Sequence, residues 1–484
     1  MTASLISSRR HGSLWARASV RLAIALAFAD ASVVVLALPQ IVVRLHTSIS
    51  HVSWVITAYN LALIAGTPLA RPVARRLAGR GTLIAGLTLF GLASLGSGAA
   101  ASLTMLIVFR CLQGLGGAML LCASLPLIAA SDDDHRLRSW AAAAAVGAAV
   151  GPAAGGVLTQ IFDWRAIFYS QAPVALAAVL AARAARPAAD PAEPAPSPSD
   201  PAARAQPDAE PPAPARPLSP AAANLALLLI SAGLIGALFI ATVLLINVWL
   251  LSPLGAAGIL VLLPVTTLVT ERLTARRPAG LTGRLGAVVL SAGLAGLALI
   301  SHRLLLGAGL ALAVCGVGLG LAFPALTRAA LATRGNALTR AARTVAAREG
   351  GLVLGLVLLT PIFVSQLNAA PAQATGPIAQ AVILAPISLP DKLRLGSGLQ
   401  QAAARAPDSQ LPDITPAFAQ IAAGADARTQ LALDELQVQV QAIIQRTVTR
   451  SFRTPLLLCA ALSLLAVPAL SLGRLRGRSP GPGG

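Results

Sequence analysis

Long apolar segments separated by short polar ones run along most of the chain. A helix needs about 20 largely apolar residues to cross a membrane. Six segments of this kind precede residue 187, at 20–43, 53–73, 81–100, 103–129, 139–160 and 165–185. Six more follow, at 222–250, 254–271, 283–300, 304–326, 340–365 and 455–473. The pattern predicts an all-α polytopic membrane protein with twelve transmembrane helices in two groups of six.

A polar segment rich in proline separates the two groups. Residues 186–220 consist largely of Pro and Ala with scattered charges. This composition cannot bury a core, so we predict a disordered linker with polyproline character. The chain then divides into a basic N-terminus (1–19), a first bundle (20–185), the linker (186–220), five helices of a second bundle (221–365), a long polar segment (366–453), a last helix (454–473) and a tail (474–484).

The polar segments between the spans differ in charge. Those on one side of the predicted membrane are rich in arginine, as at 70–81 and 271–284. Those on the other side are short and nearly uncharged, apart from the long segment 366–453. Cytoplasmic loops carry an excess of Lys and Arg. The asymmetry therefore predicts that both termini are cytoplasmic.

Residues 366–453 form a long polar segment of mixed charge. Its part from 423 to 450 has the spacing of an amphipathic helix. We predict an extracytoplasmic cap that is partly helical, and the alternative is a loosely ordered loop. The apolar stripe of this helix comprises Leu431, Leu433, Leu436, Val438, Val440, Ile443 and Ile444.

The composition excludes a soluble domain. The chain has 484 residues, of which 56% are hydrophobic and 11% charged, and its mean hydropathy is +0.75. Its formal charge of +19 does not indicate a nucleic-acid partner, because the arginines cluster at the ends of apolar segments and aromatic residues are few. The four cysteines lie in apolar segments without metal-ligand spacing, which favours a packing role. Arginine far outnumbers lysine, which is typical of a GC-rich bacterial source and points to the plasma (inner) membrane.

The segment GAAVGPAAGG, at 147–156, is unusual within a predicted membrane helix. Each glycine costs about 1 kcal/mol relative to alanine in a helix interior. Gly147, Gly151 and Gly155 are spaced four residues apart and form one smooth ridge. Membrane helices associate by close packing, so a partner backbone can approach this ridge directly. Pro152 can kink the helix there.

This segment and four others, FADASVVVLALPQI, SWVITAYNLA, VFRCLQGLGGAML and DWRAIFYSQAP, resemble motifs of the major facilitator superfamily in its multidrug–proton antiporter branch. The resemblance covers residues 20–365. It implies two six-helix bundles that alternate access around a midplane site. It also implies that the glycine motif lines the contact between the bundles of an exporter. The matching positions are Asp30, Pro39, Trp54, Tyr59, Arg110, Gln113, Gly147, Gly151, Pro152, Gly155, Gly156, Trp164 and Arg165.

The chain departs from the pattern of this branch in two places. Arg75 occupies the position of an aspartate in the family's loop between the second and third helices. Arg75 cannot supply the carboxylate of that aspartate, so the sequence does not decide whether this loop keeps the gating role that it has in the family. Close members of the branch have fourteen helices, with two between the halves, whereas this chain has the Pro/Ala linker at that point. We therefore count twelve.

Asp30 is the clearest candidate for proton coupling. It lies ten residues into the first predicted span, and so about 15 Å deep at 1.5 Å per residue. An ionised carboxylate at that depth is costly unless it is paired, so Asp30 can take up a proton. The resemblance implies that Arg110 tunes this carboxylate, and Gln113 lies one helical turn further on. A structural ion pair is the alternative.

Further polar residues are candidates for lining a cavity or forming a gate. Asn60, Asn247 and Trp249 could line the cavity, since binding sites contain few polar groups among apolar ones. Arg348 and Glu349 begin the eleventh span, where a gate or interfacial anchor is favoured over a site.

Three functions remain open. The first is a secondary active exporter of lipophilic or amphipathic small molecules by proton antiport, acting as a monomer without cofactor or metal and driven by the proton gradient. The second is a lipid or glycolipid exporter that uses the extracytoplasmic loop. The third is a non-transporting membrane receptor or scaffold. We expect no enzymatic activity, since the sequence contains neither HExxH nor GxSxG.

Overall fold

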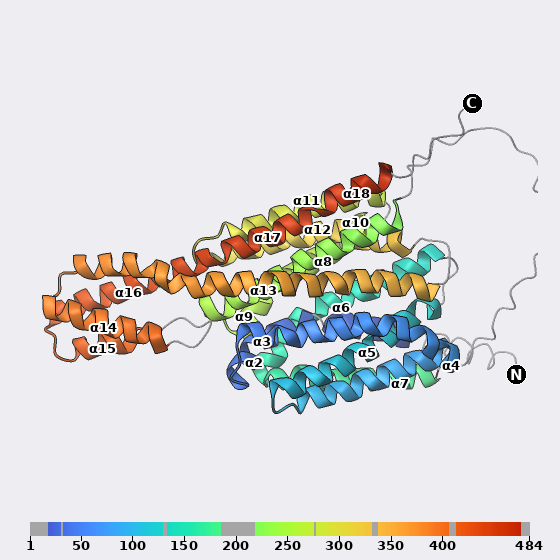
Figure 1. Ribbon diagram of the computed structural model, residues 1–484, viewed down its shortest axis with the longest axis horizontal. Coiled ribbons are helices and arrows are strands. Elements are labelled where there is room, and N and C mark those ends of the chain that lie inside the picture. Colours follow the sequence, from blue (N-terminus) through green and yellow to red (C-terminus); the bar gives the residue numbers. More distant parts are fainter. Residues whose placement is uncertain are drawn as a thin grey trace, which may run out of the picture.

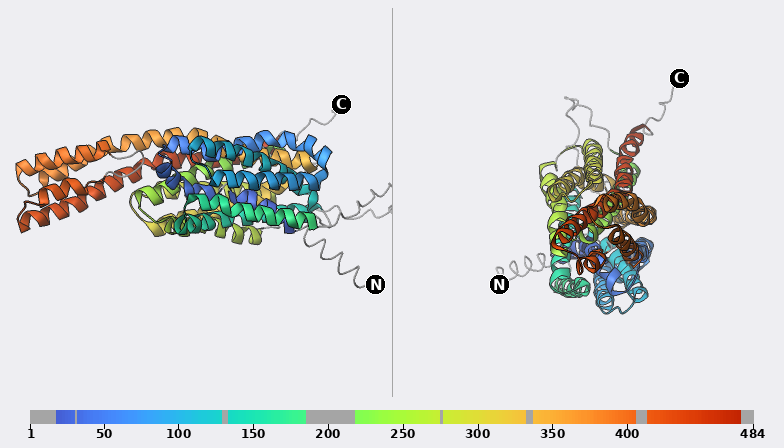
Figure 2. Two further views of the ribbon diagram at one scale, coloured as in Figure 1. Left: turned by 90° about the horizontal axis from the view of Figure 1, so that it is seen from below. Right: turned by 90° about the vertical axis from the view of Figure 1, so that its left-hand side faces the viewer.

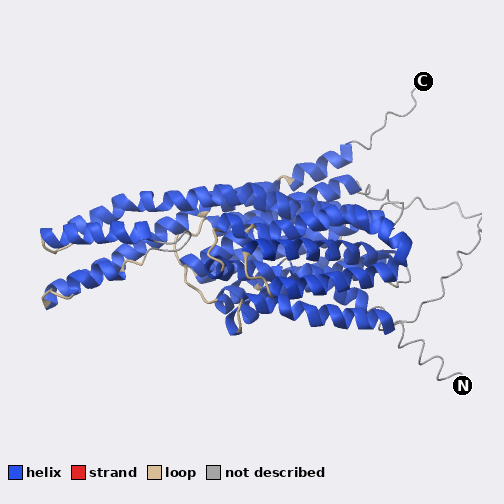
Figure 3. Cartoon of the chain, turned by 60° about the horizontal axis from the view of Figure 1, so that its bottom comes forward, coloured by secondary structure: helices blue, strands red, loops and turns tan. Residues whose placement is uncertain are grey.

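The computed structural model describes residues 18–30, 32–128, 133–184, 218–274, 277–331, 337–405 and 413–475. Within these ranges the regular structure is helical throughout (Figure 3). Most of the predicted N-terminus, linker and tail lies outside the described residues.

The first half of the chain begins with a helix over residues 18–30. It continues through the 3₁₀ turn η1 (Val34–Ala37) and the helices α2 (Leu38–Arg44), α3 (Ile49–Val52), α4 (Trp54–Gly98), α5 (Leu103–Leu127), α6 (Asp133–Ile161) and α7 (Trp164–Ala184). α4 contains the second and third predicted spans, which meet at Ala78, where φ is 56°. Arg75, just before this break, is exposed.

The second half contains α8 (Pro220–Val243), the π-helical turn η3 (Leu244–Val248), α9 (Pro253–Leu260), α10 (Leu262–Thr274), α11 (Ala279–Ala298), α12 (Leu305–Leu331), α13 (Ala337–Leu384), α14 (Leu389–Arg405), α15 (Thr415–Ala422), α16 (Ala427–Ser451), α17 (Arg453–Leu464) and α18 (Ala466–Leu475). Across the described ranges, eleven helical stretches are long and apolar enough to cross a membrane. They correspond to the predicted spans other than 139–160, and that segment lies within α6.

The two halves lie side by side with their helices roughly aligned (Figures 1 and 2). Their seam is built from two sets of helices. α13 packs on α4 and α5, and α6 packs on α9, α10 and α12. Each set therefore joins elements of opposite halves. This arrangement confirms the prediction of an all-α polytopic protein with two helical bundles.

Four helical segments project beyond the bundle, at the end away from α18 (Figure 1). The projection consists of the last part of α13, then α14, α15 and the beginning of α16, and α16 packs along α13. It coincides with the predicted cap, whose location outside the cell stays a prediction.

The predicted apolar stripe of α16 is correct only in part. Leu433, Leu436 and Val440 are buried, whereas Leu431 and Val438 are each 71% exposed. The stripe is narrower than expected because α16 has only one long packing partner, α13.

Candidate functional site

Asp30 lies in the first transmembrane helix, shortly before a change in its helical geometry. Residues 18–30 and 32–33 are α-helical, η1 begins at Val34, and α2 follows with Pro39 in its first turn. Proline suits a first turn because it lacks the N–H group that a helix start leaves unpaired. The first helix thus changes from α-helical to 3₁₀ geometry four residues after Asp30.

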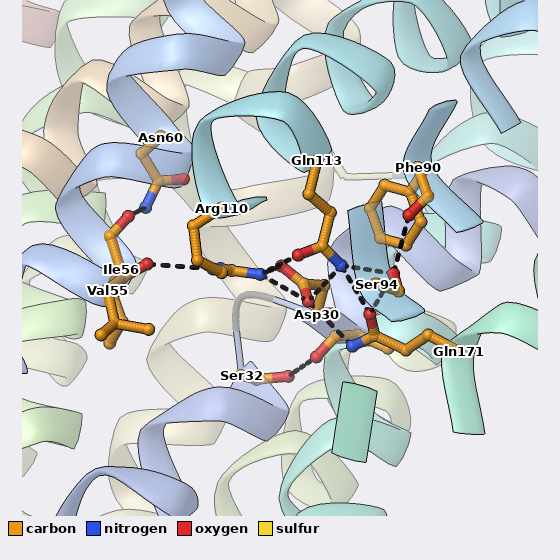
Figure 4. A network of polar contacts seen from close by, with 11 residues as sticks. Asp30, Ser32, Val55, Ile56, Asn60, Phe90, Ser94, Arg110, Gln113 and Gln171 are labelled. Atoms are coloured by element: carbon orange, nitrogen blue, oxygen red, sulfur yellow. Dashed lines mark hydrogen bonds and ion pairs between the residues drawn. The ribbon is translucent and has the colours of Figure 1, made fainter. Parts of the chain in front are cut away.

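The Asp30 carboxylate is fully buried and paired with Arg110 of α5 (Figure 4). Nη1 of Arg110 lies 2.7 Å from Oδ2 and 2.9 Å from Oδ1. The Arg110 side chain is fully buried as well. The cost of taking both charges out of water is offset only if their remaining hydrogen-bonding groups also find partners.

Two glutamine amides complete the carboxylate's surroundings (Figure 4). Nε2 of Gln171 donates to Oδ1 of Asp30 at 2.8 Å, and Nε2 of Gln113 does so at 3.3 Å. Gln113 also accepts from Arg110 Nη1 at 2.7 Å. Ser94 of α4 joins the two glutamines, accepting from Gln113 at 2.8 Å and donating to Gln171 at 3.1 Å. Four separate segments of the first half therefore meet at one carboxylate.

Arg110 has further contacts on its other side. Its Nε donates to the backbone oxygen of Val55 at 3.0 Å, and its guanidinium lies 4.2 Å from the centroid of the Tyr59 ring. Nη2 of Arg110 and the hydroxyl of Tyr59 are buried and lack hydrogen-bond partners in the described part of the chain. Arg110 therefore keeps a buried donor that no described residue uses.

The structure brings together all three residues assigned to proton coupling, namely Asp30, Arg110 and Gln113. Gln171 and Ser94 belong to the same network but were not singled out from the sequence. Gln171 is a long polar side chain about seven residues into the sixth predicted span. A polar side chain inside an apolar segment was the signal that could have found it.

The glycine ridge of α6 packs within its own half, which corrects part of the expectation. A Cβ at Gly147 would collide with the backbone of Ala25, and one at Gly151 would collide with Ser32. One at Gly155 would meet the backbone oxygen of Val33 at 2.8 Å. The ridge therefore lets the first helix approach α6.

Gly156 faces the other half of the molecule. A Cβ there would collide with the side chain of Ala257 and lie 3.0 Å from the backbone oxygen of Pro253, both in α9. Since Gly156 is offset by one residue, it points about 100° away from the ridge. Of the four motif glycines, Gly156 alone meets the opposite half.

An apolar cavity lies at the seam between the halves. Pro152 and Arg348 are the residues of the predicted site that line it. The wall also includes Phe28, Ser32, Trp140, Ala144, Leu227, Leu234, Ile235, Leu238, Leu260, Leu263, Pro264, Thr267, Leu319, Phe323, Pro324, Thr327, Thr344, Val345 and Leu352.

Asn60, Asn247, Trp249 and Glu349 are not part of the cavity wall. Asn60 donates to the backbone oxygen of Ile56 at 3.0 Å, one turn back in α4. The indole of Trp249 is buried and donates to the hydroxyl of Thr449 in α16 at 3.4 Å. The Asn60 amide N–H and the Trp249 indole N–H thus bond within the protein and do not face the cavity, which a sequence position alone does not reveal.

Arg348 and Glu349 form an ion pair in α13, with Nη1 2.8 Å from Oε1. The guanidinium of Arg348 also lies 3.9 Å from the centroid of Phe28 in the first helix. Since Arg348 belongs to the second half and Phe28 to the first, this cation–π contact crosses the seam.

The fold and this site define a membrane protein of two helical halves with a buried ion pair beside a central cavity. The family model described as Major Facilitator Superfamily matches residues 21–358, and the chain belongs to that family. It is a family of membrane transporters, not of enzymes.

Similar proteins include several drug-resistance proteins. The chain is 33% identical over 156 residues to the tetracenomycin C resistance and export protein of Streptomyces glaucescens, covering 31% of this chain and 29% of that one. It is 42% identical over 159 residues to the puromycin resistance protein of Streptomyces alboniger, covering 32% of each. The matches thus span about a third of these relatives.

Solved structures share the fold. A bacterial homologue of the human lysosomal transporter Spinster, in an inward-facing and unoccupied conformation, superposes with a TM-score of 0.57 at 16% identity, over 97% of this chain and 99% of that one. A D-xylose–proton symporter gives a TM-score of 0.56 at 13% identity, over 71% of this chain and 89% of that one.

Proposed function

We propose that this protein is a secondary transporter that exports lipophilic or amphipathic small molecules across the plasma membrane in exchange for protons. It acts as a monomer by alternating access, and the proton gradient drives it. The names of its relatives, which describe resistance and export, support a drug-like substrate.

One stretch of the first helix carries this proposal, because it touches three features at once. Asp30 lies in the ion-pair network, while Phe28 and Ser32, two residues before and after it, line the cavity. Ser32 also lies against Gly151 of the α6 ridge. A change in the charge of Asp30 therefore acts on the same short segment that shapes the cavity.

The break in this segment gives it a way to respond. A 3₁₀ stretch within a helix often marks a hinge, and η1 begins at Val34, four residues after Asp30. When Asp30 takes up a proton, the ion pair with Arg110 is lost and the arginine is left buried without a counter-charge. The network then favours a different arrangement, and movement of the first helix couples proton uptake to the cavity.

The test uses inverted membrane vesicles and N-phenyl-1-naphthylamine, a neutral fluorescent lipophile. Adding the compound to wild-type vesicles with an imposed pH gradient should release protons, and the compound should accumulate inside. Asp30→Asn should abolish both signals while inserting normally. Asp434→Asn, which changes an exposed acid on α16, is the matched control and should behave like the wild type. Proton-coupled transport that survives in Asp30→Asn would refute the role of this residue.

A further inference from the structure

The cavity at the seam has a largely apolar wall that includes one positively charged side chain. Arg348 is the one charged residue that lines it in the described part of the chain. We propose that the cavity binds an amphipathic molecule with an anionic headgroup, such as a carboxylate, sulfate or phosphate, and that Arg348 and Thr344 hold the headgroup. This inference rests on the proposed function and names its substrate class.

The buried acid of the first helix does not supply a counter-charge for a cationic substrate. Asp30 is absent from the cavity wall, and its carboxylate already contacts Arg110, Gln113 and Gln171. Glu349 is not part of the wall either. The sign of the charge that a ligand meets is therefore that of Arg348.

The guanidinium of Arg348 keeps hydrogen-bonding capacity for a ligand. It has five N–H donors in a fixed plane. Nη1 donates to Glu349, whereas Nε has no partner among the described residues. Its Cζ lies 3.9 Å from the centroid of the Phe28 ring and 5.7 Å from that of Phe323. These cation–π contacts hold the guanidinium in place and do not use its N–H donors.

Thr344 supplies a second donor beside Arg348. It lies four residues earlier in α13, so the two side chains share one face of the helix. Thr344 also lines the cavity, is only 3% exposed, and its hydroxyl has no hydrogen-bond partner within the described ranges. A buried hydroxyl without a partner is costly. An oxyanion that accepts hydrogen bonds from both Arg348 and Thr344 would give the Thr344 hydroxyl a partner. Hydrogen bonds to a charged group are stronger than those between neutral groups.

The remainder of the wall fits an apolar body. Along α8 the lining residues extend from Leu227 to Leu238, a rise of about 16 Å at 1.5 Å per residue. The cavity volume is about 140 Å³. Since drug-sized sites measure about 300–1,000 Å³, this one suits a single chain or a compact ring system better than a two-chain phospholipid.

The test compares two probes with the same ring system. 8-Anilinonaphthalene-1-sulfonate carries a sulfonate that N-phenyl-1-naphthylamine lacks. Equilibrium dialysis against wild-type protein in phosphatidylcholine nanodiscs, corrected with empty discs, should show that the sulfonate probe binds about tenfold more tightly or better. Equal affinity would overturn the proposal.

Two variants separate the headgroup site from a folding defect. Glu349→Gln removes the carboxylate that competes for Arg348, so the sulfonate probe should bind more tightly. The double variant Arg348→Gln/Glu349→Gln leaves neither charge unpaired. It should lose the preference for the sulfonate while its size-exclusion profile stays that of folded protein. A preference that persists in the double variant would show that Arg348 is not its source.

Two further outcomes tell a membrane lipid from a free ligand, and the binding proposal from the antiport proposal. In discs containing phosphatidylglycerol, the affinity difference between the wild type and the double variant should persist. Its disappearance would mean that an anionic lipid occupies the site, against a single-chain ligand. Failure of both probes to drive proton release in vesicles would refute proton antiport, and the binding preference would be unaffected by that result.

Discussion

Nη1 of Arg110 contacts both carboxylate oxygens of Asp30, although the two residues are 80 positions apart in the sequence. Both side chains are fully buried. The pair joins the first helix to α5 four residues before the first helix changes to the 3₁₀ turn η1.

Removing the arginine should destabilise the protein strongly. Arg110→Gln leaves the Asp30 carboxylate buried without its cation, which costs about 3–5 kcal/mol in comparable pairs. Thermal unfolding in detergent should show a clear fall in the midpoint. The double variant Asp30→Asn/Arg110→Gln should recover most of the loss, because neither charge is then unpaired. A double variant as unstable as Arg110→Gln would show that packing, and not charge, explains the effect.

Replacing Gln171 should slow transport, although the sequence analysis did not single this residue out. Gln171→Leu removes the donor 2.8 Å from Asp30 Oδ1. A hydrogen bond to a charged group contributes about 1.5–3 kcal/mol. The initial rate of proton-coupled export should therefore fall by about tenfold or more. Gln160→Leu, at an exposed position of α6, is the control. Similar rates in both variants would exclude Gln171 from the mechanism.

Two glycines of the α6 motif should respond differently to leucine. Gly151→Leu collides with Ser32 inside the first half, so it should reduce the yield of folded protein. Gly156→Leu collides with Ala257 across the seam, so it should impair transport with a smaller effect on folding. Gly258→Leu, where a Cβ meets nothing within 4 Å, is the control. Size-exclusion profiles and vesicle transport measure the two effects, and identical behaviour of the two motif variants would contradict this assignment.

The projecting helices should depend on one face of α16. Leu433 is 1% exposed and Leu431 is 71% exposed. Leu433→Ala removes buried packing that is worth about 2–5 kcal/mol in a core, whereas Leu431→Ala should change stability by less than about 0.5 kcal/mol. Limited proteolysis of the 366–453 region should therefore be faster in Leu433→Ala alone. Equal cleavage of both variants would mean that α16 is not held by this face.

The predicted orientation in the membrane can be tested with single cysteines. In a background without the four native cysteines, Ser397→Cys on α14 should react with a membrane-impermeant maleimide in intact cells. Arg75→Cys, at an exposed position near the break in α4, should react only in inverted vesicles. Both positions labelling from the same side would show that the charge asymmetry of the loops was misread.

Much of the fold follows from the sequence. A membrane span has to be apolar for about 20 residues, so each span can be recognised from its own segment of the sequence. Eleven of the twelve predicted segments correspond to helical stretches long and apolar enough to span, and the remaining one lies in α6. Asp30 and Arg110 were recognisable for the same reason, since an ionisable group is conspicuous among apolar neighbours.

The tertiary structure decided which residues meet. Hydropathy does not specify the rotation of a helix, because lipid tails and neighbouring helices are equally apolar. The sequence therefore did not show that Gln171 and Ser94 complete the Asp30 network or that the glycine ridge faces the first helix. It also did not show that Asn60 and Trp249 lie outside the cavity wall. These contacts depend on close fit between backbones that are far apart in the chain, and only the assembled bundle provides it.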